Sequence, residues 1–189
     1  MIFHETSLKD AWLLDLERRG DQRGFFARTM CVDEFAAHGM DTEFLQQNIS
    51  VSAEQGTLRG MHFQHMPHAE TKLMRCLRGA VVDIIVDLRP ESPSFEKWEA
   101  FELNEENKRQ LYVPKGFAHG FQTLTDDVEV SYLVAGKYAP AHESGVRYND
   151  PAFNIVWPLP VSVISDKDKN WPLWISPART VEPVLQAGA

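Results

Sequence analysis

The stretch GAVVDIIVDL, residues 79–88, is dominated by the branched aliphatic side chains that β-strands favour. It is followed directly by RPESP, residues 89–93, a cluster of turn-forming residues. A short apolar run that stops at a turn predicts one strand of a sheet.

Further strand-like runs lie on both sides of this stretch, from residue 45 to about residue 134. Residues 110–114, QLYVP, stop at a Lys-Gly turn. In residues 128–134, VEVSYLV, alternate positions carry Val128, Val130, Tyr132 and Val134, so one face of the predicted strand holds them all. Many short strands joined by proline and glycine turns predict a mainly β protein, a sandwich or jelly roll.

Helix signals are few and short. Residues 31–39 predict one short helix, with Asp33 as its cap and Gly39 as its end. At 189 residues and 43% hydrophobic content, the chain fits a single domain over residues 1–189. From Pro140 onward it is rich in proline and tryptophan, and we expect this irregular tail to fold back on the core and on the site.

The net charge of −8 at pH 7 argues against a general nucleic-acid surface, which needs a basic stripe. An anionic small molecule is compatible with it where positive side chains cluster against the overall field. The candidates for such a cluster are Arg23, Arg28, Arg59 and Lys72.

No apolar stretch approaches membrane-spanning length, and residues 1–10 lack the basic-then-apolar pattern of a leader. The expected compartment is therefore the cytoplasm. The two cysteines, Cys31 and Cys76, stand outside any Cys-x-x-Cys pair. Cys76 falls in an apolar run, which predicts a buried free thiol.

The residues with the most informative chemistry surround His62, in LRGMHFQ, residues 58–64. Strand alternation places His62 and Gln64 on one face, and a strand glycine, Gly60, permits close approach by a ligand. Lys72, Tyr132 and Asp168 follow along the chain. An imidazole, an ammonium, a phenol and a carboxylate suit the movement of a proton beside a carbonyl group, and do not form a nucleophile set.

Each of these residues also has an ordinary structural interpretation. A lone strand histidine is more often a hydrogen-bonded core residue, and Tyr132 or Tyr138 alone would be read as aromatic packing. Asp168 lies in an Asp-Lys-Asp-Lys run, which is usually a solvated face.

A metal site is a further alternative, suggested by His65, His68 and Glu70. Metal-binding β-sandwiches take two histidines two positions apart on one strand face, but the position two after His62 is Gln64. We therefore assign no metal ligand. A metal-dependent dioxygenase is the rival that this pattern leaves open.

Five segments in order along the chain resemble dTDP-4-dehydrorhamnose 3,5-epimerases. They are DQRGFF at 21–26, LRGMHFQ at 58–64, ENKRQLYVP with GFAHGF at 106–121, NDP at 149–151 and SDKD at 165–168. Any one segment is moderate evidence, whereas five in register cover nearly the whole chain.

The resemblance implies a jelly-roll, cupin-like subunit of the double-stranded β-helix type. It also implies a homodimer whose N-terminal strands cross between subunits, with no metal or cofactor. By the same resemblance His62 is the proton-abstracting base and Asp168 the carboxylate that orients it. Lys72 is the cation beside the sugar oxygen, and Tyr132 is the proton donor on the opposite face. The implied nucleotide-sugar contacts are Arg23, Gln46, Asn48, Arg59, His119, Glu143 and Lys167, with Phe26, Arg28, Gln47 and Tyr138 as further candidates.

The chain departs from the family pattern after the Phe-Phe pair, where Ala27-Arg28 stands. The family usually has a glutamate there that reads the thymine edge. Arginine only donates hydrogen bonds, so Arg28 inverts the polarity of this position and suits the acceptor edge of cytosine or a phosphate. The identity of the base stays open.

The sequence therefore predicts an epimerase that inverts C3, C5 or both in a nucleotide-linked 4-keto-6-deoxyhexose, by histidine-mediated proton abstraction through an enolate. Its place would be deoxysugar, rhamnose-type or surface-polysaccharide biosynthesis. The alternatives are a C3-only or C5-only epimerase, a sugar-nucleotide ketoisomerase, or a non-catalytic sugar-binding cupin, and the substrate could be CDP-linked.

Overall fold

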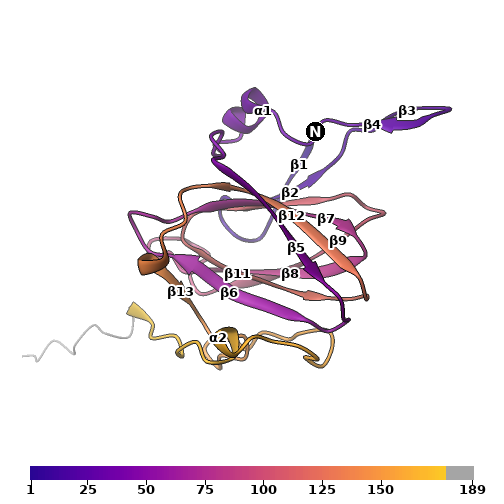
Figure 1. The fold of residues 1–189 in the computed structure, drawn as a ribbon. Helices are drawn as coiled ribbons and strands as arrows, with labels where there is room; N and C mark the ends of the chain where they lie inside the picture. The colour runs from indigo at the N-terminus through magenta and orange to yellow at the C-terminus, as the bar shows by residue number, and fades with distance from the viewer. Residues whose placement is uncertain (178–189) are drawn as a thin grey trace, which may run out of the picture.

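Two antiparallel β-sheets lie face to face in the computed structural model, which describes residues 1–177 (Figure 1). The first sheet has six strands in the order β1-β2-β10-β7-β12-β5. These strands are β1 (Ile2–Glu5), β2 (Trp12–Asp15), β5 (Gln46–Ser52), β7 (Thr71–Arg78), β10 (Gln110–Val113) and β12 (Val128–Ala135).

The second sheet has five strands in the order β13-β6-β11-β8-β9. Its members are β6 (Leu58–Gln64), β8 (Ala80–Asp87), β9 (Trp98–Asn104), β11 (Phe117–Thr123) and β13 (Glu143–Gly145). Neighbouring strands of both sheets are antiparallel.

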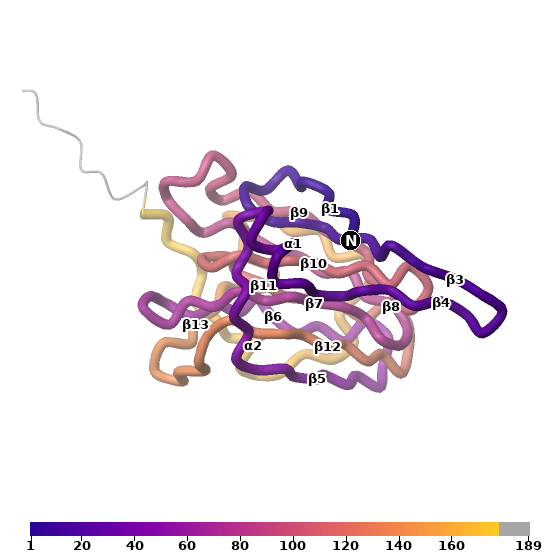
Figure 2. The backbone as a smooth tube through the Cα atoms, turned by 90° about the horizontal axis from the view of Figure 1, so that it is seen from above, coloured from indigo at the N-terminus to yellow at the C-terminus, as the bar shows by residue number. Residues whose placement is uncertain are grey.

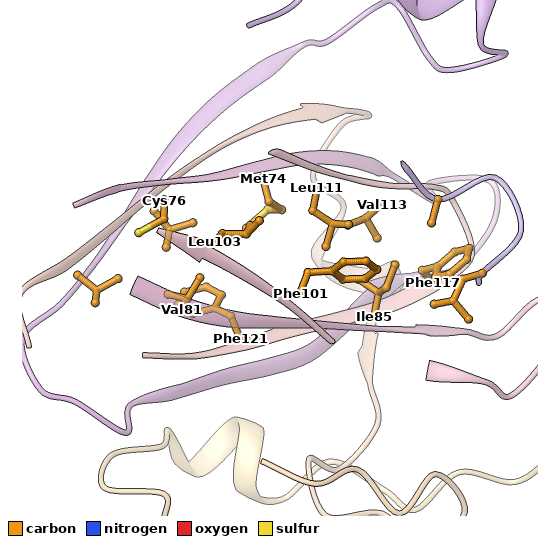
Figure 3. Packing of buried hydrophobic residues seen from close by; sticks show 14 residues of the cluster. Met74, Cys76, Val81, Ile85, Phe101, Leu103, Leu111, Val113, Phe117 and Phe121 are labelled. Atoms are coloured by element: carbon orange, nitrogen blue, oxygen red, sulfur yellow. The ribbon is translucent and has the colours of Figure 1, made fainter. Parts of the chain in front are cut away.

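The main core lies between the two sheets (Figure 3). Met74, Leu111 and Val113 of the six-stranded sheet pack against Val81 and Ile85 of the other, and all are at most 2% exposed. Full burial of each such aliphatic side chain stabilises the fold by about 1.5–3 kcal/mol. The alternation predicted for residues 128–134 is confirmed, because Val128, Val130 and Val134 are buried.

Residues 79–88 are apolar at most positions on both faces of β8, with Asp83 and Asp87 as the exceptions, because the strand is covered on both sides. Ile84 and Val86 point away from the main core into a second cluster, where Phe153 and Trp174 pack. Trp98 Nε1 ties this layer down by donating to Phe153 O at 2.9 Å. A strand buried on both faces loses the polar alternation of a half-exposed one.

Helices are few, as predicted: α1 (Val32–Ala37), the 3₁₀ turn η1 (Pro140–His142) and α2 (Asp166–Lys169). None of the helices in the described part of the chain is long and apolar enough to cross a membrane. The predicted cap of α1 is wrong. Cys31 occupies that position without a side-chain hydrogen bond, and Asp33 lies inside the first turn. Gly39 does follow the helix end, with a left-handed φ of 68°.

Both cysteines are free among the described residues, and Cys76 is buried, as predicted. Burial raises the pKa of the Cys76 thiol to about 11, so this sulfur stays protonated and inert near neutral pH.

A two-stranded hairpin, β3 (Arg19–Asp21) and β4 (Gly24–Phe26), projects from the body of the molecule. Both views show it extending well beyond the two sheets (Figures 1 and 2). Phe25 and Phe26 are 47% and 69% exposed on this arm, which leaves two aromatic rings without a core of their own.

Candidate active site

Two adjoining cavities lie beside the main core, of about 370 Å³ and about 670 Å³. His62, Lys72 and Tyr132 line both of them. Three of the four predicted catalytic side chains therefore meet on one continuous hollow. The fourth, Asp168, lines the smaller cavity.

His62 and Asp168 form a close pair. The Nε2 atom of His62 is 2.6 Å from Oδ1 of Asp168. The other carboxylate oxygen, Oδ2, accepts the backbone N–H of Gly60 at 3.1 Å. The imidazole is 32% exposed and the carboxylate 7% exposed, so the imidazole ring reaches the cavity while its partner is shielded.

Helix α2 fixes the position of Asp168. Ser165 begins the helix, and its Oγ accepts the backbone N–H of Asp168 at 3.1 Å. Burial alone would raise the pKa of Asp168. The hydrogen bond and charge of His62, together with the Gly60 N–H, outweigh burial and hold that pKa below its usual value. Asp168 is therefore an anion beside the imidazole.

The sequence suggested that Gly60 leaves space for a ligand, but the structure shows that it does not. Its φ is +144°, and a Cβ at this position would meet Gly120 Cα at 2.5 Å. The two glycines let β6 and β11 come together where His62 and His119 stand opposite each other. The space that a side chain would occupy is filled by the neighbouring strand.

Tyr132 and Lys72 come from the opposite sheet, on the adjacent strands β12 and β7. Burial raises the pKa of Tyr132, the charge of Glu70 raises it further, and Arg59 opposes these effects. The phenol thus stays protonated well above neutral pH. A proton donor on one wall consequently faces a histidine–carboxylate pair on the other.

A hydrogen-bonded group of Tyr138, Glu143 and Lys167 lies at the larger cavity, which Tyr138 and Glu143 line. Glu143 accepts from Lys167 Nζ at 2.6 Å and from Tyr138 OH at 2.9 Å. Burial would raise the pKa of Glu143, but these two hydrogen bonds and the nearby charges of Lys167 and His62 lower it overall. The hydrogen bond to Glu143 likewise raises the pKa of Lys167.

Arg59 and His119 complete the smaller cavity. Arg59 is held by Ser52 Oγ at 3.1 Å and by Val51 O at 2.9 Å. His119 Nε2 lies 2.8 Å from Asp83 Oδ1, without the alignment of a hydrogen bond.

Strand β5 divides its predicted residues between two faces. Gln46 and Asn48 line the larger cavity opposite Val134 and Tyr132. Gln47 also borders that cavity, but its side-chain amide donates to Ser131 Oγ at 3.3 Å, on the other face of the sheet. The amide of Gln47 is thus engaged on the other face of the sheet, and its contact with the nucleotide sugar stays a prediction.

Arg23, Phe26 and Arg28 line neither cavity. Arg23 and Phe26 lie on the projecting hairpin, where Arg23 pairs with Asp21. Arg28 Nη1 pairs with Glu34 Oε1 at 3.1 Å, at the start of α1. Of the four expected cationic residues, only Arg59 and Lys72 meet within this subunit.

The sequence argument missed two acidic partners. Asp83 and Glu70 contact His119 and Lys72, respectively. The available signal for Asp83 was its place inside an apolar run, because a carboxylate in a buried strand needs a partner. The structure shows that Asp83 is 0% exposed. Among residues 1–177 no three His, Cys, Asp or Glu side chains are placed to hold a metal ion. His68 instead packs against His142, with ring centroids 4.4 Å apart and the ring planes tilted by 44°.

A histidine–carboxylate pair facing a tyrosine and a lysine across a cavity in a two-sheet sandwich fits an enzyme that moves protons, and comparison with known proteins shows the epimerase class. The family model for dTDP-4-dehydrorhamnose 3,5-epimerase matches residues 5–175. The chain belongs to this family, and the predicted fold class, enzyme class and family resemblance are confirmed. The non-catalytic alternative has no support among these relatives.

Three relatives show how close the match is. A dTDP-4-dehydrorhamnose 3,5-epimerase of Sinorhizobium fredii is 43% identical over 91% of this chain and 89% of its own length. The Bacillus anthracis enzyme of that name, solved with TDP and PPi bound, is 46% identical with a TM-score of 0.88, over 92% of this chain and 99% of its own. A dTDP-4-dehydrorhamnose 3-epimerase of Streptomyces niveus is 38% identical over 90% of this chain and 82% of its own.

Proposed function

We propose that this epimerase inverts C3 and C5 of a dTDP-linked 4-keto-6-deoxyhexose, with His62 as the base and Tyr132 as the acid. The observation that carries the proposal is the His62–Asp168 pair, 2.6 Å between Nε2 and Oδ1, facing Tyr132 across one cavity. The names of the relatives support a dTDP-linked substrate.

The 4-keto group makes the hydrogens on C3 and C5 acidic, because the carbanion left behind delocalises as an enolate. His62 takes the proton. With Nε2 bound to Asp168, its other ring nitrogen, Nδ1, is the one that accepts it. The Asp168 carboxylate then balances the charge of the imidazolium.

Lys72 places an ammonium where the enolate oxygen forms, and a preorganised donor of this kind is typically worth about 3–4 kcal/mol in the barrier. Tyr132 then gives its proton to the carbon from the opposite wall, which inverts the centre. Nearby positive charges fit the anionic diphosphate, although the chain as a whole carries −8. Those in or beside the cavities are Arg59, Lys72 and Lys167.

The test is incubation with the nucleotide-linked 4-keto-6-deoxy sugar in deuterated water, followed by NMR at C3 and C5. We expect His62→Ala to abolish exchange of both hydrogens while nucleotide binding is largely retained. His4→Ala, a change to an exposed histidine on β1, is the matched control. Exchange at the wild-type rate in His62→Ala would disprove the mechanism, and deuterium at C3 alone would favour the C3-only alternative that the S. niveus relative represents.

A CDP-linked sugar is a second candidate substrate, because Arg28 stands where the family usually has a thymine-reading glutamate. A mispaired polar group costs about 1–3 kcal/mol, so the preference for dTDP would fall by roughly ten- to a hundredfold. Calorimetric titration with dTDP, CDP, UDP and GDP tests this. Binding of dTDP more than about tenfold tighter than the other three would eliminate the CDP candidate.

We also propose a homodimer, in which the projecting hairpin reaches the partner subunit. The outer face of β5 exposes Ile49 and Val51 at 58% and 55%. On the same side of that sheet, Arg75 Nε is buried without a hydrogen-bond partner among residues 1–177. Exposed aliphatic side chains beside a buried arginine are compatible with a protein interface, where apolar surface and arginine are common. The cytoplasmic location expected from the sequence stays a prediction.

A further inference from the structure

Lys72 is not a free cation in its cavity, because Glu70 holds it. Glu70 Oε1 lies 2.8 Å from Lys72 Nζ, and the two side chains are only 14% and 12% exposed. The second carboxylate oxygen, Oε2, accepts from Gln64 Nε2 at 2.9 Å. Both oxygens of Glu70 are therefore engaged, one by the lysine and one by a neighbouring amide.

Gln64 is itself fixed in place. It is 4% exposed, its Oε1 accepts the Ala139 N–H at 2.8 Å, and its Nε2 also lies 3.0 Å from His68 O. These contacts tie β6 to the loop before β7 and to the loop after β12. A chain of contacts thus runs from a buried, multiply bonded amide through a carboxylate to the ammonium.

The backbone around Glu70 is built for this placement. A Cβ at Gly136 would meet Glu70 Cβ at 3.2 Å, which is tighter than ordinary contact, and the φ of Gly136 is +158°. The glycine lets the chain leaving β12 pass directly over Glu70.

We propose that Glu70, oriented by Gln64, is a positioning residue that fixes the Lys72 ammonium against the C4 oxygen of the substrate. The inference rests on the proposed function, in which Lys72 meets that oxygen. A lysine side chain has four rotatable bonds, so an unpaired ammonium would sample many positions. Catalysis by a preorganised charge requires one position, and Glu70 supplies it.

Glu70 also acts on Tyr132 through its charge. Burial raises the pKa of Tyr132 first, Glu70 raises it further, and Arg59 lowers it. The other titratable groups that line the two cavities with Tyr132 are His62, Lys72, His119, Tyr138, Glu143 and Asp168. Removal of the Glu70 charge lowers the pKa of Tyr132, so the phenol loses its proton, and the enzyme its acid, at a lower pH.

The decisive variant is Glu70→Gln, which keeps the size of the side chain and removes its charge. We expect kcat to fall about tenfold with KM within about twofold, because the lysine is mispositioned rather than lost. We also expect the alkaline limb of the kcat profile to move to lower pH, because the charge of Glu70 raises the pKa of Tyr132. Glu105→Gln, an exposed position on another loop, is the matched control and should change neither quantity.

Glu70→Asp separates the two effects, since it keeps the charge but withdraws it by one methylene. It should restore the alkaline limb while kcat stays low. If both the alkaline limb and kcat of Glu70→Gln match the wild type, the inference is overturned. Thermal unfolding at the wild-type temperature shows that the variant is folded.

A direct titration makes the result independent of turnover. The Cζ carbons of the four tyrosines can be labelled with ¹³C and followed by NMR against pH, with Tyr132→Phe identifying the Tyr132 signal. We expect that signal to titrate at a lower pH in Glu70→Gln. An unchanged titration refutes the coupling to Tyr132 even if the enzyme is active. A wild-type enzyme without substrate exchange would instead refute the proposed function, and the titration would still decide whether Glu70 acts on Tyr132.

Discussion

At the scale of single residues, Asp168 combines two tasks. It pairs with His62 across 106 positions of sequence, and its backbone N–H is capped by Ser165 at the start of α2. Its depressed pKa keeps it ionised near neutral pH, so its charge is available to the imidazolium that the proposed mechanism forms. A substitution that keeps the shape of the side chain and removes its charge leaves the backbone cap intact and tests the charge alone.

Asp168→Asn should retain the fold and lower kcat by at least about tenfold, or about 1.4 kcal/mol in the barrier. The amide oxygen still accepts from His62 Nε2 but cannot balance a positive imidazole. Steady-state kinetics with the keto sugar measures the loss. Asp166→Asn, in the same turn of α2 and exposed, serves as the control. Unchanged activity in Asp168→Asn would mean that the pair is only structural.

Tyr132→Phe should separate exchange from inversion. Without the phenol, His62 returns the proton to the face from which it came, so deuterium enters with retained configuration while inverted product falls sharply. NMR of the recovered sugar distinguishes the two outcomes. Normal inversion in this variant would assign the donor role to water or to Tyr138, whose hydroxyl donates to Glu143 at 2.9 Å.

His62 and Asp168 could be predicted because each stands in a segment that resembles the family, whereas Lys72 and Tyr132 lie outside those segments, and the partners of Lys72 and His119 could not be predicted. Glu70 and Asp83 lie outside the recognised roles, and only the fold shows that they contact Lys72 and His119. Arg28 illustrates the opposite limit. Its contact with a base or a phosphate stays a prediction, and its ion pair with Glu34, six residues on, depends on the path of the chain into α1.

At the scale of elements, the alternation of apolar residues and the positions of turn residues were enough to predict several of the strands. The run at residues 79–88 became β8 within one residue at each end, because its sequence satisfies two apolar faces. The cap of α1 was wrong, since an aspartate near a helix start is equally favourable within the first turn, beside the positive end of the helix dipole. Propensity does not separate these two positions.

The turn after β8 depends on a buried charge. Asp87 is 0% exposed and accepts from Arg89 Nε at 2.9 Å and from Ser94 Oγ at 2.7 Å. Burial would raise the pKa of Asp87, but the hydrogen bonds from Arg89, Ser92 and Ser94 lower it overall. A depressed folded pKa contributes stability above the unfolded value, and this contribution is lost as the pH falls through the folded pKa.

We therefore expect Asp87→Asn to lower the free energy of unfolding by about 3 kcal/mol at pH 7, as expected when a buried charge pair is broken. The difference from wild type should shrink below about pH 3.9, where the carboxyl begins to protonate in the unfolded chain. Urea unfolding at pH 7 and pH 3 measures both values. Glu91→Gln, an exposed change in the same turn, should have no effect, and an equal loss at both pH values would contradict the electrostatic account.

At the scale of the whole molecule, the projecting hairpin separates two predicted substrate contacts from the cavities. The β3–β4 hairpin carries Arg23 and Phe26 away from the sheets, and neither residue lines a cavity of its own subunit (Figure 2). Arg23 is 90% exposed, with Asp21 as its partner. If these residues bind substrate, as the family resemblance implies, they do so in the cavity of another copy.

Complementation between two inactive variants tests this arrangement. In a symmetric dimer that exchanges hairpins, a subunit with His62→Ala lends an intact hairpin to a partner with Arg23→Ala, and that partner supplies an intact cavity. Random re-pairing makes about half of the dimers mixed, each with one complete site of two, so the mixture should regain about a quarter of wild-type activity. The two parent variants measured separately are the controls.

Sedimentation tests the dimer itself. We expect Ile49→Asp to weaken the dimer, whereas Val156→Asp, at an exposed apolar position in the irregular segment after β13, should leave it unchanged. No regain of activity in a mixture shown to contain mixed dimers would place Arg23 in its own subunit's site or outside the site altogether.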